Sequence, residues 1–123
     1  MTVFGCAMSS QYLQQDGVKK LVEESRGEIE VAVSASEDGI LLEENGANGF
    51  SDMLAALGAA LAAGVDEAFR VYFSVGVERV TVALSDGRLM VVKPVRGRVI
   101  CAITKPKPRL GLVLHLLDRI SEN

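Results

Sequence analysis

Apolar residues recur along the chain with two different periods. In some segments they return every three or four residues, as on one side of a helix, and in others they alternate with polar residues, as on a strand. On this basis we predict helices over residues 10–26, 51–70 and 109–120, and strands over residues 28–34, 40–44, 79–84, 89–92 and 98–104. The segment 94–97 is expected to close the fourth strand. The expected order is helix, two strands, helix, three strands, helix.

The first strand has the clearest pattern. Ile29, Val31 and Val33 alternate with polar or small residues, and we expect them to share the one buried face of a half-buried strand. The pairs at 38–39 and 86–87 are both Asp-Gly, which is typical of tight hairpin turns in which glycine takes a positive φ. Strands joined by such short turns are antiparallel. The sequence therefore predicts an α+β domain built on a five-stranded antiparallel sheet.

The middle helix has an unusual composition. Ser51 is expected to cap its N-terminus, and Asp52 is well placed for the helix dipole. A stripe at helical spacing consists of Leu54, Leu57, Leu61, Val65, Ala68 and Tyr72. Beside it the surface is almost entirely alanine and glycine, and each of the glycines Gly58 and Gly64 costs about 1 kcal/mol relative to alanine within a helix. Close approach of another backbone is the usual compensation, so we expect a close neighbour here.

The composition fits a single globular domain over residues 1–123, with residues 1–9 loosely ordered. Hydrophobic residues make up 49% and charged residues 24%, which argues against intrinsic disorder. Aromatic residues make up only 5% and Trp is absent, so few rings are present for bases to stack on, and nucleic-acid binding is not expected. No apolar run reaches the length that crosses a bilayer, and the first residues lack the pattern of a signal peptide, so we predict a cytoplasmic protein.

The net charge of −3 is unevenly distributed. Residues 1–67 hold 12 acidic and 3 basic side chains, whereas residues 68–123 hold 4 acidic and 10 basic ones. We expect the two halves to pair across their own sheet. Seven of the basic residues lie in the segment 88–109, which has no acid. Either this segment docks an acidic partner, a phosphate or a membrane surface, or Arg98 and Lys105 pair with the first strand while the other basic residues are solvated.

Catalytic and metal-binding patterns are missing from the sequence. The only histidine is His115, which is expected on the solvated side of the last helix, and Cys6 and Cys101 are far apart. This set cannot make a zinc site with the usual ligands, and Cys101 is expected to be a small buried apolar residue. Nucleophilic Cys–His or Ser–His–Asp chemistry would have to use His115, and nothing around it indicates an orienting carboxylate. Neither of the glycine-rich phosphate-binding patterns occurs. We therefore predict a protein that is not an enzyme and has no cofactor, metal or catalytic residue.

Several segments together resemble the Roadblock/dynein light chain family, including its prokaryotic members. They are VAVSASEDGILLEE, the alanine-rich helix MLAALGAALAAGVDEAF, the strand pair VERVTVALSDGRLMVVKPV, and the closing helix LGLVLHLLDRI. The resemblance covers nearly everything from residue 10 to residue 121. It implies a sheet with the second helix on one face and the two terminal helices on the other, as in profilin-like folds.

The resemblance also implies a homodimer in which the third strand pairs with its copy and the second helices pack side by side. Residues expected at this interface are Leu57, Gly58, Leu61, Ala62, Val65, Arg79, Val80, Thr81, Val82, Ala83 and Leu84. An unpaired edge strand and the small-residue helix would both gain a neighbour in this way.

Members of this family are generally adaptors, and many bind small Ras-like GTPases. The resemblance therefore implies a dimeric, non-enzymatic adaptor or regulator of such a GTPase, for which we expect a docking surface at Ala55, Ala59, Ala63 and Asp66. Arg70, Arg79 and Arg88 are candidates for a donated arginine in residue type only. Alternative functions are a PAS- or profilin-like small-molecule sensor and a purely structural self-assembly module.

Overall fold

The computed structural model describes residues 17–46 and 49–122. Residues 17–24 are helical, and the remaining elements are β1 (Ile29–Ser36), β2 (Leu41–Asn45), α2 (Ser51–Phe73), β3 (Val80–Ala83), β4 (Leu89–Val95), β5 (Arg98–Thr104) and α3 (Leu110–Glu122). The predictions for residues 1–9, for Cys6 and for the first turns of the helix at 10–26 lie outside the described residues. Within them, every predicted element is present.

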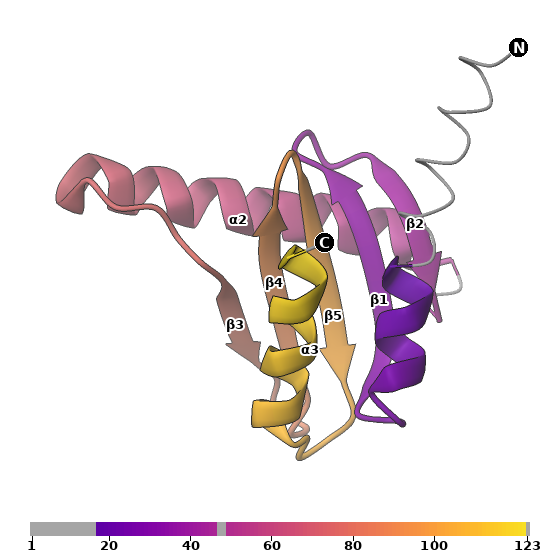
Figure 1. Ribbon diagram of the computed structural model, residues 1–123. Helices are drawn as coiled ribbons and strands as arrows, with labels where there is room; N and C mark the ends of the chain where they lie inside the picture. The colour runs from indigo at the N-terminus through magenta and orange to yellow at the C-terminus, as the bar shows by residue number, and fades with distance from the viewer. Residues whose placement is uncertain (1–16, 47–48, 123) are drawn as a thin grey trace, which may run out of the picture.

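The five strands form one antiparallel sheet in the order β2-β1-β5-β4-β3. Figure 1 shows α2 crossing one face of this sheet, while α3 and the first helix cover the other face. β5, the last strand along the chain, therefore lies at the centre of the sheet, and β2 and β3 lie at its edges. This arrangement confirms the predicted α+β class, the antiparallel sheet and the distribution of helices on its two faces.

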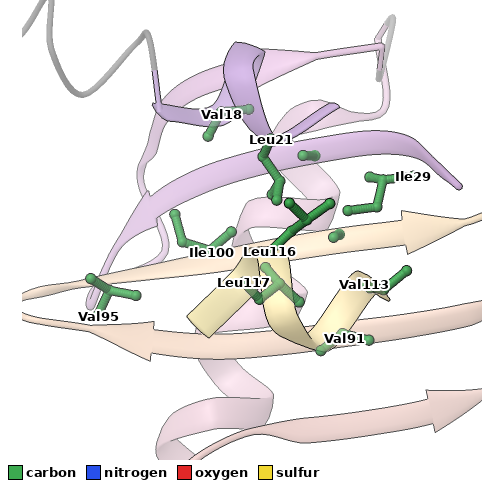
Figure 2. Close-up of a cluster of buried hydrophobic side chains, with 11 residues drawn as sticks. Val18, Leu21, Ile29, Val91, Val95, Ile100, Val113, Leu116 and Leu117 are labelled. Carbon is green, nitrogen blue, oxygen red and sulfur yellow. The ribbon is translucent and has the colours of Figure 1, made fainter. Parts of the chain in front are cut away.

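Each face of the sheet has its own apolar core. On the face of the terminal helices, Val18, Leu21, Val113, Leu116 and Leu117 pack onto Ile29, Val91, Val95 and Ile100 (Figure 2). On the other face, Leu54 and Ala62 of α2 pack onto side chains of the sheet that include Val33, Val92 and Cys101. Because both faces are covered, the central strands are apolar on both sides, as expected for a three-layer arrangement.

The expectation of a half-buried first strand with Ile29, Val31 and Val33 on one face is wrong. Ala32 and Val33 are both fully buried although they face opposite sides of the sheet. The register of β1 against β5 also shifts between Ile29 and Val31, so Ile29 joins one core while Val31 packs against the other. A bulge of this kind adds a residue and reverses the side-chain alternation.

Strand β4 is longer than predicted. It continues through Pro94 to Val95, and Pro94 pairs with Val99 of β5. On its other side β4 pairs with β3 only as far as Val92. Pro94 therefore lies where β4 has a single neighbour, which is where a strand tolerates a residue without a backbone N–H.

The tight turns form as predicted, but the predicted helix cap does not. Gly39 has φ +90° and Gly87 has φ +94°, the left-handed region that glycine occupies without strain. Ser51, in contrast, is the first residue inside α2, and the residue at the N-cap position is Phe50, which makes no side-chain cap. A serine one residue into the helix is past the position from which its hydroxyl reaches the free N–H groups.

Candidate protein-interaction surface

Helix α2 is too long for the sheet that it covers. Its 23 residues extend about 34 Å, whereas five strands span about 19 Å. The buried residues of α2 end at Ala62, and residues 67–73 are all exposed. We call these seven residues the overhang. Figure 1 shows that this end of α2 projects past the edge strand β3.

The overhang carries large apolar side chains into solvent. Phe69 is 44% exposed, Phe73 66% and Tyr72 80%, and the rings of Phe69 and Phe73 stack with their centres 5.7 Å apart. Phe69 and Phe73 follow Ala62 by seven and eleven residues, so they continue the side of α2 that packs on the sheet. An apolar patch of this kind on a small domain marks an interaction surface.

The edge strand beside the overhang is open and uncharged. β3 has the sequence VTVA, pairs with β4 in a regular register, and has no strand on its other side among residues 17–46 and 49–122. The opposite edge strand, β2, contains two glutamates and a register irregularity against β1. Charges and bulges on an edge strand prevent further pairing. Of the two edges, β3 is therefore the one suited to pairing with another strand.

Asp66 ties the overhang to the segment that leads into β3. Its carboxylate accepts a hydrogen bond from Arg70 Nε at 2.7 Å and another from the backbone N–H of Val77 at 2.9 Å. The Arg70 side chain and then the Val77 N–H lower the pKa of Asp66 below its usual value. Asp66 was predicted to meet a partner, but its carboxylate is already engaged in fixing this connection.

Several residues that the sequence assigned to an interface lie inside the protein. Ala55 and Ala59, predicted to dock a partner, and Gly58 and Ala62, predicted at the dimer interface, all face the sheet of their own chain and are buried. The close neighbour of Gly58 is Cys101 of β5, not a second subunit. These four predictions are wrong, because the small residues are needed for α2 to lie close to its own sheet.

The other predicted interface residues remain accessible. Ala63 is exposed, Leu57 is 45% exposed, and Leu61 and Val65 are half-buried. In β3, Thr81 and Ala83 are exposed. Phe69 and Phe73 were missed as interface residues, and Tyr72 was expected only on the apolar stripe of the helix. Apolar residues that continue the helical spacing to Phe73 were the available signal.

All three candidate arginines form ion pairs with carboxylates of their own chain. Arg70 binds Asp66, and Arg79 lies 3.5 Å from Asp118. Arg88 binds Asp86 at 2.9 Å and also contacts Glu30. Each would have to leave these partners before it could reach a bound nucleotide.

The expected pairing between the two halves of the chain is confirmed. Lys105 lies 2.7 Å from Glu28, Arg98 lies 3.4 Å from Glu43, and Arg88 contacts Glu30. Glu28 also accepts a hydrogen bond from the Arg109 N–H at 2.7 Å. Lys105 and then this N–H lower the pKa of Glu28. Much of the basic segment 88–109 is thus used inside the fold.

Conventional catalytic and metal-binding features are not visible in the described part of the chain. No cluster of three potential metal ligands occurs there. Burial raises the pKa of the Cys101 thiol to about 12, so this cysteine is not a nucleophile at neutral pH. His115 is exposed. Among the helices of these same residues, none has the length and apolar character needed to span a membrane.

Comparison with known proteins supports a Roadblock-type fold. A Roadblock/LC7 domain from Streptomyces avermitilis superimposes on this chain with a TM-score of 0.77 and 20% sequence identity. The superposition covers 88% of this chain and 91% of that domain. Myxococcus xanthus MglB gives a TM-score of 0.78 at 16% identity, covering 88% of this chain and 81% of that one. A Schizosaccharomyces pombe profilin gives 0.65 at 10% identity, covering 88% and 93%. No protein-family model and no curated protein matches the sequence.

Proposed function

We propose that this protein is a homodimeric adaptor that docks a small Ras-like GTPase and carries out no chemistry itself. The observation that carries the proposal is the apolar overhang beside an unpaired, uncharged edge strand. The choice of a Ras-like GTPase as the partner rests on the resemblance to Roadblock proteins, and the likeness in fold to MglB is consistent with this choice.

In the proposed dimer, the β3 strands of two copies pair antiparallel about a two-fold axis. The sheet then continues into the partner, whose strands follow at intervals of about 4.8 Å. The seven-residue overhang is about 10 Å long and therefore covers about two of these strands. Phe69 and Phe73 pack on the partner's sheet as Leu54 and Ala62 pack on their own. An apolar surface that the single chain leaves in water becomes buried.

The same two-fold axis brings the two α2 helices together. Leu57, Leu61 and Val65 are spaced by four residues along one flank of α2 and are only partly buried. In the dimer this flank meets the same flank of the partner's helix, an isologous contact of the kind that closes a dimer. Of the interface predicted from the sequence, these three residues and β3 remain part of the proposal.

The side of α2 that faces away from the sheet remains open for a third protein. Met53, Ala56, Ala60, Ala63 and Glu67 form one exposed line along this side. The line is made largely of small side chains, so another backbone can approach closely. We assign the GTPase to this surface, which we call the outer face of α2.

The test is direct binding between purified proteins. A Ras-like GTPase from the same source is loaded with GDP or with a non-hydrolysable GTP analogue and titrated with this protein by isothermal calorimetry. We expect binding that depends on the nucleotide, with one GTPase for one or two chains. A protein that binds no such GTPase in either state is not the proposed adaptor.

A further inference from the structure

Internal ion pairs leave one group of carboxylates unused. Between Arg26 and Arg70 the chain contains nine acidic residues and no basic one. Four of the nine form the contacts already described, Glu28, Glu30 and Glu43 to the basic segment and Asp66 to Arg70. The other five are exposed and take part in no ion pair among the residues that the structure describes: Glu37, Asp38, Glu44, Asp52 and Glu67.

Most of these unused carboxylates border the outer face of α2. The turn that holds Glu37 and Asp38 rests on this helix, because a Cβ added to Gly39 would lie 3.3 Å from the Cα of Ala56. Asp52 is one helical turn before Ala56, and Glu67 is one turn after Ala63. Asp52 and Glu67 are fifteen residues apart in sequence, which corresponds to about 22 Å along the helix.

Between the carboxylates the exposed side chains are apolar. Ile40 is 64% exposed and Met53 66%, and both are large enough to bury a useful area against a partner. Ala56, Ala60 and Ala63 form a floor of small side chains between the two acidic ends. A partner that fits this surface has an apolar patch at the centre of its contact area and positively charged groups about 22 Å apart at the margins of that area.

We propose that the outer face of α2 selects its partner by charge: the GTPase that docks there presents lysine or arginine residues around an apolar contact. The inference rests on the proposed function and specifies the chemistry of the partner's surface. Exposed carboxylates attract a positively charged protein during encounter and disfavour the binding of a negatively charged one. The alanine floor supplies few anchors of its own, so the charges contribute most of the discrimination.

The experiment measures association of the analogue-loaded Ras-like GTPase by stopped flow at 50 and 500 mM NaCl. The test variant is Asp52→Asn with Glu67→Gln, and the control is Glu23→Gln with Glu44→Gln, which removes the same charge from exposed sites away from the outer face. We expect the wild-type rate constant to fall about tenfold at the higher salt. The test variant should associate several-fold more slowly at low salt, whereas the control stays within about twofold.

Three outcomes would contradict this account in distinguishable ways. Binding that is independent of salt, or binding that both variants slow equally, overturns the role of the outer-face carboxylates but leaves the adaptor function standing. Failure of the wild-type protein to bind the GTPase in either nucleotide state overturns the adaptor function, and this inference with it. Circular dichroism of each variant confirms that the fold is intact before rates are compared.

Discussion

Gly58 of α2 lies directly against Cys101 of β5. A Cβ added to Gly58 would come within 3.2 Å of the Cys101 Cβ and 3.4 Å of its sulfur. Cys101 is buried in the central strand, with β1 and β4 on either side, so it has little room to move. The absence of a side chain at Gly58 is what lets α2 approach the sheet closely.

Gly58→Ala should therefore destabilise the protein although alanine favours a helix. We expect the steric cost to exceed the helical gain and to lower the free energy of unfolding by about 1 kcal/mol. Urea denaturation provides the measurement. Gly64→Ala is the matched control, because no atom of the described residues lies within 4 Å of the added Cβ and the same helix should gain up to about 1 kcal/mol. Equal gains at both positions would show that α2 does not lie close to the sheet at Gly58.

Asp66→Ala should loosen the connection between α2 and β3 without disturbing the core. The substitution removes the acceptor for the Val77 N–H and the partner of Arg70. We expect faster hydrogen exchange at Val77 and over residues 74–79, with unchanged protection in β5. Protection at Val77 as high as in the wild-type protein would mean that Asp66 does not hold this segment.

The contacts of the Glu28 carboxylate should stabilise the protein at neutral pH, and this contribution should be lost in acid. The pKa of Glu28 is lowered from 4.5 in the folded state by Lys105 and the Arg109 N–H, so the unfolded chain binds the proton more readily than the folded one. The contribution is fully present above pH 4.5 and is lost as the pH falls through the lower, folded-state pKa. Glu28→Gln should flatten the decline of urea midpoints between about pH 5 and pH 3. A decline as steep as that of the wild-type protein would contradict this role.

Thr81→Lys should weaken self-association through β3. Thr81 is exposed in the middle of the edge strand, so antiparallel pairing with a copy would bring two lysines near each other. We expect the dimer dissociation constant in 50 mM NaCl to rise about tenfold, with partial recovery in 500 mM NaCl because salt screens the repulsion. A dissociation constant that does not change would place the dimer contact elsewhere.

Local features of the fold could be predicted from the sequence because they depend on neighbouring residues. The positive φ of Gly39 and Gly87 follows from Asp-Gly chemistry, and the spacing of Val18 and Leu21 is enough to find a buried helical side. The reversal between Ile29 and Val31 could not be found in this way, because a bulge depends on the register against β5, a strand some seventy residues further along the chain.

The interface was harder to predict, since small residues have two possible uses. Gly58 and Ala62 allow close packing on the sheet as readily as against a second helix, and only the three-dimensional arrangement decides between them. The exposure of Phe69 and Phe73 depends on the length of α2 relative to the width of the sheet beneath it. Periodicity alone marks such residues as core.

The most direct test of the proposed dimer is sedimentation velocity of the wild-type protein and of Phe69→Glu. The control is Leu42→Glu, since Leu42 is 45% exposed and Phe69 is 44% exposed. We predict that the wild-type protein and Leu42→Glu sediment as dimers, and that Phe69→Glu sediments as a folded monomer. A monomeric wild-type protein, or a Phe69→Glu variant that remains dimeric, would contradict a dimer held together by the overhang.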